Sequence, residues 1–193
     1  MKITFIGTSH GVPEKGRFCT CIMLESGGSV YFVDAGAPMV DYMLRLNKNV
    51  NDLRAVFTTH VHSDHTVGLV HLADLMNWYY KKSSAEFFVT EQEHIDATKQ
   101  WIYTSGDGQI DETRLKFKIP SEGVVYRDEN ITVEYIKNEG IRLILQPMSR
   151  QGQLRRYLAT EGFDVIKEVY SYSQGKYYVT LCGGNAQRYG RWV

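Results

Sequence analysis

The sequence predicts an α/β protein. Short runs of β-branched and aromatic residues recur at strand length, and segments with helical spacing separate several of them. Clusters of glycine, proline and asparagine punctuate both kinds of segment. With 193 residues, of which 43% are hydrophobic and 23% are charged, the chain has the length and composition of one good-sized globular domain.

The balance of charges and the search for targeting segments limit the classes of partner that we expect. The 22 basic residues balance 22 acidic ones, so the net charge gives no reason to expect attraction to nucleic acid or membrane. No charged segment followed by an apolar run opens the chain, and no apolar stretch reaches the roughly 18 residues of a membrane span. The three cysteines form no disulfide framework. We therefore expect a cytoplasmic protein without a signal peptide or a membrane segment.

The first sixty residues carry the strand signals in order. Strands are predicted at Lys2–Ile6, Cys21–Leu24, Val30–Val33 and Ala55–Thr58, with a hairpin turn over residues 26–29. Cys19 and Cys21 lie at the entry to the second of these strands. A single residue separates them, which is shorter than the spacing of zinc-binding cysteine pairs, so we expect small hydrophobic roles.

Three helices follow from apolar spacing and start signals. The first begins near Pro38, the second covers Val67–Tyr80, and the third runs to Tyr103 from a capping box made by Thr90 and Glu93. The predicted inward positions are Met39, Val40, Met43 and Leu44 on the first helix, and Leu69, Leu72, Ala73 and Met76 on the second.

Further strands are predicted at 86–89, 115–119, 124–127 and 131–136, and the pattern changes near residue 139. Beyond it we predict a strand at 142–146, a helix at 152–161 and strands at 165–172 and 177–181. The chain is thus divided into an N-terminal part (1–139), a βαββ segment (140–182) and a flexible polar tail (183–193).

Four of six consecutive residues directly after a predicted strand can bind a metal: His60, His62, Asp64 and His65. Strand alternation places the first two on one side, and the other two turn in from the start of a helix. Imidazole and carboxylate ligands suit Zn²⁺, and also Fe or Mn. The two pairs suggest one or two metal ions, and Zn²⁺ can lower the pKa of water to near 7.

The remaining histidines are given lesser roles. His71 and His94 lie on predicted helices, where solvated or core-edge positions are expected. His10 lies in a glycine-bounded loop near the N-terminus and is a candidate for the mouth of the site.

The six-residue segment resembles the H-x-H-x-D-H signature of the metallo-β-lactamase superfamily. Residues 5–13 are similar to the opening of its ribonuclease Z-like members, and residues 31–36 to its strand that ends in Asp-x-Gly. The resemblance, over about residues 1–137, implies a four-layer αβ/βα sandwich with a truncated or replaced second half. It implies that His60 and His62 bind one metal and Asp64 and His65 a second. It also implies that Asp64 orients the attacking water and that Asp34 steadies the ligand loop.

The ligand set that the family uses is incomplete in this sequence. No histidine follows His94, and Asp164 is the only aspartate beyond residue 140. Residues 141–181 instead resemble the C-terminal end of the bacterial tRNA adenine N1-methyltransferase family, without the glycine-rich segment that binds the methyl donor. The chain therefore looks like a chimera.

Three functions stay open at this point. The leading one is a zinc-dependent hydrolase that cleaves an ester or phosphodiester, in a small molecule or a nucleic acid. The alternatives are a catalytically impaired metal-binding or interaction domain and a tRNA-associated methyltransferase fragment. No membrane partner is expected, and a homodimer is compatible with the sequence.

Overall fold

The structure is a computed structural model that describes residues 1–9, 11–136, 140–145, 165–171 and 176–181. Its chain forms two compact units, Met1–Ile119 and Pro120–Val193. Among these described residues, each unit contains one β-sheet. In the part of the chain that the structure describes, no helix combines the length and the apolar character needed to cross a membrane.

The first unit is built on a mixed sheet of seven strands in the order β2-β1-β3-β4-β5-β6-β7. β1 pairs antiparallel with β3, and β3 with β4, whereas β4 to β7 run parallel to one another. The strands are β1 (Lys2–Ser9), β2 (Phe18–Cys19), β3 (Cys21–Ser26), β4 (Ser29–Val33), β5 (Leu53–Phe57), β6 (Ala85–Phe88) and β7 (Leu115–Lys118).

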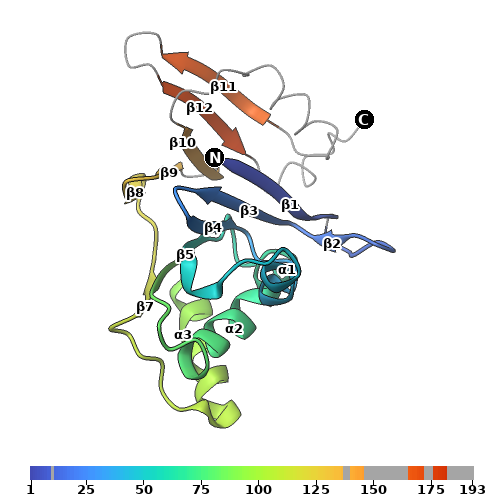
Figure 1. The fold of residues 1–193 in the computed structure, drawn as a ribbon, viewed down its shortest axis with the longest axis vertical. Helices are drawn as coiled ribbons and strands as arrows, with labels where there is room; N and C mark the ends of the chain where they lie inside the picture. Colours follow the sequence, from blue (N-terminus) through green and yellow to red (C-terminus); the bar gives the residue numbers. More distant parts are fainter. Residues whose placement is uncertain (10, 137–139, 146–164, 172–175, 182–193) are drawn as a thin grey trace. The chain divides into compact units, whose positions relative to one another are not determined.

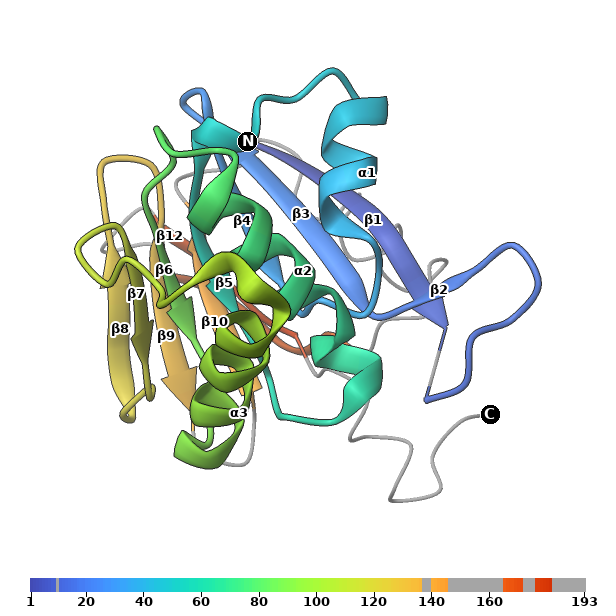
Figure 2. The ribbon, with the colours of Figure 1, turned by 90° about the horizontal axis from the view of Figure 1, so that it is seen from below.

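Three α-helices connect the parallel strands: α1 (Met39–Arg45), α2 (Ser63–Trp78) and α3 (Gln92–Ile102). Each crossover leads to the next strand in the same direction along the sheet. Because such crossovers are right-handed, the helices must lie on one face. Figures 1 and 2 show α1, α2 and α3 together on that face. A short 3₁₀ helix (Val50–Asp52) precedes β5, and a π-helical turn (Tyr103–Asp107) follows α3.

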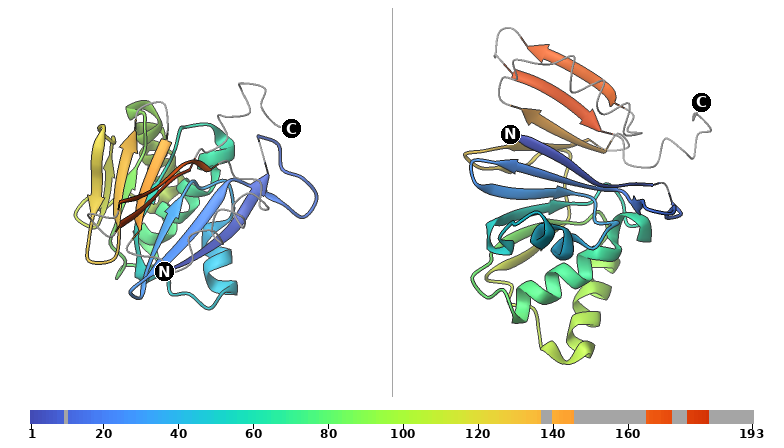
Figure 3. Two further views of the ribbon diagram at one scale, coloured as in Figure 1. Left: turned by 90° about the horizontal axis from the view of Figure 1, so that it is seen from above. Right: turned by 45° about the vertical axis from the view of Figure 1, so that its right-hand side comes forward.

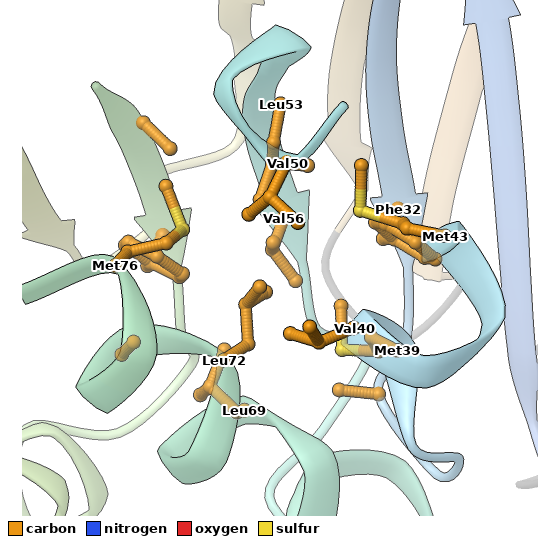
Figure 4. Packing of buried hydrophobic residues seen from close by; sticks show 14 of the residues in the cluster. Phe32, Met39, Val40, Met43, Val50, Leu53, Val56, Leu69, Leu72 and Met76 are labelled. Atoms are coloured by element: carbon orange, nitrogen blue, oxygen red, sulfur yellow. The ribbon is translucent and has the colours of Figure 1, made fainter. Parts of the chain in front are cut away.

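The core of this unit lies between the sheet and the three helices. Met39, Val40 and Met43 of α1 and Leu69, Leu72 and Met76 of α2 are buried against residues of β4 and β5, including Phe32 and Val56 (Figure 4). Each fully buried aliphatic side chain contributes about 1.5–3 kcal/mol relative to an exposed one. This packing fixes the start of α2 beside the ends of β4 and β5.

The second unit contains an antiparallel sheet of five strands in the order β11-β12-β10-β9-β8. Figure 3 shows β10, β12 and β11, coloured from brown to red, side by side. The pairing of β9 with β10 crosses residue 139, where the sequence analysis placed a domain boundary. The strands are β8 (Gly123–Arg127), β9 (Thr132–Ile136), β10 (Gly140–Leu145), β11 (Val165–Ser171) and β12 (Lys176–Leu181).

The structure confirms the α/β class, and it corrects three local predictions. The capping box is wrong, because α3 begins after Glu91 and no side chain caps it. Leu44 is 52% exposed, so the apolar face of α1 consists of Met39, Val40 and Met43. α2 begins at Ser63, four residues before the predicted Val67. The predicted helix at 152–161 and the tail at 183–193 lie outside the described residues.

Candidate metal centre

The candidate site lies where two neighbouring parallel strands end. β4 ends at Val33 and is followed by Asp34, and β5 ends at Phe57 and is followed by Thr58, Thr59 and His60. The two strands pair in register as far as Val33 and Phe57. Ligands of parallel α/β sheets bind outside the carboxyl ends of the strands, so these residues occupy the edge at which chemistry is expected.

The first turn of α2 lies directly on the segment after β4. The Ala35 N–H donates to the His65 carbonyl at 2.7 Å, and the Ala35 carbonyl accepts from the Gly68 N–H at 2.7 Å. A Cβ on Gly68 would meet the Ala37 carbonyl oxygen at 2.2 Å, and one on Gly36 would meet the Asp64 carbonyl oxygen at 2.0 Å. Both positions therefore require glycine for the close approach that brings Asp64 and His65 to the strand ends.

His60, His62 and Asp64 form a group of possible metal ligands. One ligand atom from each lies within 4.8 Å of the others. The His60 ring centroid is 4.6 Å from that of His62 and 4.0 Å from that of His65. His60 and Asp64 are half-buried and His62 is exposed, so the group is open to solvent on one side. The His65 side chain is 1% exposed, and its Nε2 lies 3.2 Å from the Asp64 Oδ2.

Asp34 is a buried carboxylate that lies beneath this group. Its Oδ1 accepts from the Thr59 N–H at 2.8 Å, and its Oδ2 lies 2.7 Å from the His65 Nδ1. The Thr59 hydroxyl lies 3.0 Å from both carboxylate oxygens. Asp34 has a φ of 58°, a left-handed conformation that aspartate tolerates better than most residues, and this turns the carboxylate toward the end of β5.

His60 and His65 have opposite pKa shifts. Burial and then the charge of His65 lower the pKa of His60, and Asp34 acts in the opposite direction, so that the net pKa is about 4. His60 is therefore neutral at pH 7, the form that binds metals. Burial alone would lower the pKa of His65 as well, but the charge and hydrogen bonds of Asp34 and Asp64 raise it above its ordinary value.

A largely apolar pocket of about 530 Å³ opens beside Asp64. This volume lies within the usual range for small-molecule sites. Its walls come from β2 and the loop before it, the segment after β4 and the first turns of α2. They include Pro13, Phe18, Cys19, Pro38, Asp64, Val67 and His71.

The other described residues singled out from the sequence lie outside the group of His60, His62 and Asp64. His10 lies outside the described residues. His71 is exposed on α2 and His94 is half-buried on α3, in agreement with the solvated or core-edge roles expected. Cys19 and Cys21 are both buried, as expected of small hydrophobes. Thr59 and Gly68 were not predicted from the sequence, although Thr59 is next to His60 and Gly68 is three residues after His65.

Comparison with known protein families identifies the family of this chain. Residues 1–141 match the family model described as anti-Pycsar protein Apyc1, which is well over half of the sequence. The chain belongs to the anti-Pycsar Apyc1 family. The match covers the whole candidate site and ends within β10.

Several proteins with similar sequences are named ribonuclease Z. This Apyc1-family chain is 29% identical to one from Pseudomonas putida over 73% of its own length and 52% of that protein. It is 38% identical to one from Nitrosopumilus maritimus over 46% of its own length and 29% of that protein. The chain thus spans about half the length of the first relative and less of the second.

Solved structures confirm the metallo-β-lactamase fold that the sequence analysis expected. Human tRNase Z, short form, has a TM-score of 0.59 with 16% identity and covers 75% of this chain and 63% of its own. The metallo-β-lactamase fold protein YhfI of Bacillus subtilis has a TM-score of 0.57 with 16% identity and covers 74% and 56%. These matches give no support to the methyltransferase resemblance or to a chimera, and both stay predictions.

Proposed function

We propose that this Apyc1-family chain is a metal-dependent hydrolase that cleaves an ester or phosphodiester bond at the His60–His65 segment. The observation that carries the proposal is the convergence of His60, His62 and Asp64 to within 4.8 Å, next to a buried aspartate. The relatives named ribonuclease Z and the fold shared with tRNase Z support the same reaction class.

The donor set fits a zinc ion, with Mn or Fe as alternatives. Two imidazoles and one carboxylate are ligands that Zn²⁺ takes in catalytic sites, where three protein groups leave a fourth position open. His60, His62 and Asp64 would hold the ion, and the exposed position of His62 leaves that side of the group open to solvent. When bound, the ion supplies Lewis acidity and lowers the pKa of water.

The other residues would position the ligands and the substrate. Asp34 would hold the His65 ring through its Nδ1, at the 2.7 Å that the structure shows. The Asp64 carboxylate would accept a hydrogen bond from the attacking water. The apolar pocket beside Asp64 would receive the apolar or aromatic group attached to the scissile ester, whether the substrate is a small molecule or a nucleic acid. A cytoplasmic location belongs to the same proposal.

The test measures both the metal content and the turnover of the full chain. We expect purified protein to contain zinc, and to hydrolyse bis(p-nitrophenyl) phosphate in a reaction that a chelator abolishes and added zinc restores. His62→Ala should lose both bound zinc and turnover. His94→Ala, which removes a histidine outside the group, should keep both.

The outcomes separate the proposal from its alternative. Bound zinc without hydrolysis of any phosphodiester or ester tested would refute the hydrolase and favour a non-catalytic metal-binding domain. A chain that binds no metal, even with zinc supplied, would refute both.

A further inference from the structure

Thr59 is the residue directly before His60, and its hydroxyl lies between two groups of the candidate centre. The Thr59 Oγ1 is 3.0 Å from both carboxylate oxygens of Asp34 and 3.1 Å from the His60 Nδ1. The backbone N–H of Thr59 also donates to the Asp34 Oδ1 at 2.8 Å. The hydroxyl is thus anchored by a carboxylate that is fully buried and 25 residues earlier in the chain.

The hydroxyl carries a single proton, and that decides the direction of both hydrogen bonds. A carboxylate only accepts, so the Thr59 O–H must donate to Asp34. The Thr59 oxygen is then left with lone pairs toward His60, which means that the His60 Nδ1 must carry the proton. If the Thr59 O–H instead donated to the His60 Nδ1, the Thr59 oxygen and the Asp34 carboxylate would lie 3.0 Å apart with no proton between them.

The protonated Nδ1 leaves the other ring nitrogen of His60 as the metal ligand. Which imidazole nitrogen binds a metal is set by the hydrogen bond that the other nitrogen makes. The same carboxylate acts on His65, whose Nδ1 lies 2.7 Å from the Asp34 Oδ2. One buried aspartate therefore orients two neighbouring rings, His65 directly and His60 through the threonine.

We propose that Thr59 is a positioning residue that holds His60 in the Nδ1–H tautomer and presents Nε2 to the metal. The inference rests on the proposed metal centre, and it concerns ligand geometry, not turnover. Groups that hydrogen-bond a metal-binding histidine typically change metal affinity by about 10- to 100-fold when removed. The Thr59→Val variant keeps the side-chain shape and the backbone N–H but has no hydroxyl.

The experiment compares three variants of the full chain. Thr59→Val should bind zinc about 10- to 100-fold more weakly than wild type in competition with a chromogenic chelator. Thr59→Ser, which keeps the hydroxyl, should restore most of the affinity. Thr58→Val is the matched control, because the Thr58 hydroxyl donates to the Phe88 carbonyl at 3.1 Å and lies outside the ligand group. It should lower thermal stability and leave zinc affinity near that of wild type.

The second readout is the tautomer itself. Long-range ¹H–¹⁵N spectra of the metal-free chain should show His60 with its proton on Nδ1 in wild type and Thr59→Ser. Thr59→Val should lose this preference. This readout does not need bound metal, so it decides the inference even in a chain that proves to be inactive.

Three results would overturn the proposal. The first is a wild-type spectrum with the His60 proton on Nε2. The second is a Thr59→Val variant with unchanged spectra and unchanged zinc affinity. The third is an equal loss of affinity in Thr58→Val, which would assign the effect to general loss of stability. A chain that binds zinc and cleaves nothing would refute the hydrolase while leaving this inference intact.

Discussion

Replacing Gly68 with alanine has two opposing effects on the free energy of unfolding. In a helix interior this change ordinarily stabilises a protein by about 0.5–1 kcal/mol, because alanine loses less backbone entropy. At Gly68, however, the new Cβ would lie 2.2 Å from the Ala37 carbonyl oxygen and 2.9 Å from that of Ala35. Ordinary van der Waals contact begins at 3.4 Å, so α2 and the segment after β4 must separate by about 1 Å.

The separation strains the contacts that hold the ligand segment in place. It lengthens the 2.7 Å hydrogen bond from the Gly68 N–H to the Ala35 carbonyl, and the 2.7 Å bond from the Ala35 N–H to the His65 carbonyl. Overpacking of this kind typically costs 1–3 kcal/mol, which exceeds the gain in helix propensity. We expect a net loss of about 1–2 kcal/mol, and a fall in Tm of roughly 2–4 °C for each kcal/mol.

Thermal unfolding followed by far-UV circular dichroism measures this balance. The control is Val67→Ala, at the neighbouring position of the same helix, where the side chain is 64% exposed. That variant should keep the wild-type Tm or exceed it slightly, because alanine has the higher helix propensity. A Gly68→Ala protein that is more stable than wild type, with unchanged zinc affinity, would refute the close approach of α2 to the segment after β4.

Four further predictions concern single side chains. Asp34→Asn should destabilise the fold by about 1–3 kcal/mol in urea unfolding and weaken zinc binding, because an amide satisfies fewer of the buried donors around it. Arg114→Ala should cost about 1–3 kcal/mol in the same assay, because its guanidinium donates to the carbonyls of Met76 and Asn77 at the end of α2 and of Ser83 before β6. Val67→Asp should raise KM for bis(p-nitrophenyl) phosphate on the order of tenfold, about 1.4 kcal/mol, and leave zinc content unchanged. Cys21 should resist iodoacetamide in the native chain, because burial and then the charge of Asp34 raise the pKa of its thiol.

Each of these has an outcome that would contradict it. An Asp34→Asn chain with wild-type stability would show that the hydrogen bonds beneath the site contribute little. If an Arg114→Lys variant were as stable as wild type, the contribution of Arg114 would come from its charge and not from the three hydrogen bonds to carbonyls. A change in kcat alone for Val67→Asp would remove the pocket from substrate binding. Peptide mapping that finds native Cys21 alkylated would contradict its burial.

Short-range patterns in the sequence predicted the elements that position the site. β4, β5 and α2 follow from alternation and helical spacing, and the inward residues Leu69 and Met76 are buried as expected. These signals succeed because each depends on neighbours a few residues away. The same reasoning predicted that Leu44 points inward, but its side chain is exposed. How much of α1 is buried depends on the segments that pack against it, and helical spacing alone does not contain that information.

The contacts that orient the ligands could not be predicted in this way. Thr59 acts on His60 only because Asp34, 25 residues earlier, lies beneath it with a left-handed backbone. Gly68 matters because a carbonyl from the segment after β4 lies where a Cβ would be. Both facts concern pairs of segments brought together by parallel strand pairing, and no local pattern contains them. The hexapeptide was visible because its chemistry is contiguous in sequence.

We predict the number of metal ions from how the donors are distributed. The sequence suggests two pairs of donors, and two protein ligands per ion is fewer than zinc usually takes. In the described residues, ligand atoms of His60, His62 and Asp64 lie within 4.8 Å of one another. The Nδ1 of His65 is held by Asp34, and its Nε2 lies 3.2 Å from the Asp64 Oδ2. Three donors form a complete catalytic set with one open position. We therefore expect one tightly held zinc per chain by elemental analysis. Two tightly held ions would require donors beyond this group, because His65 alone adds only one.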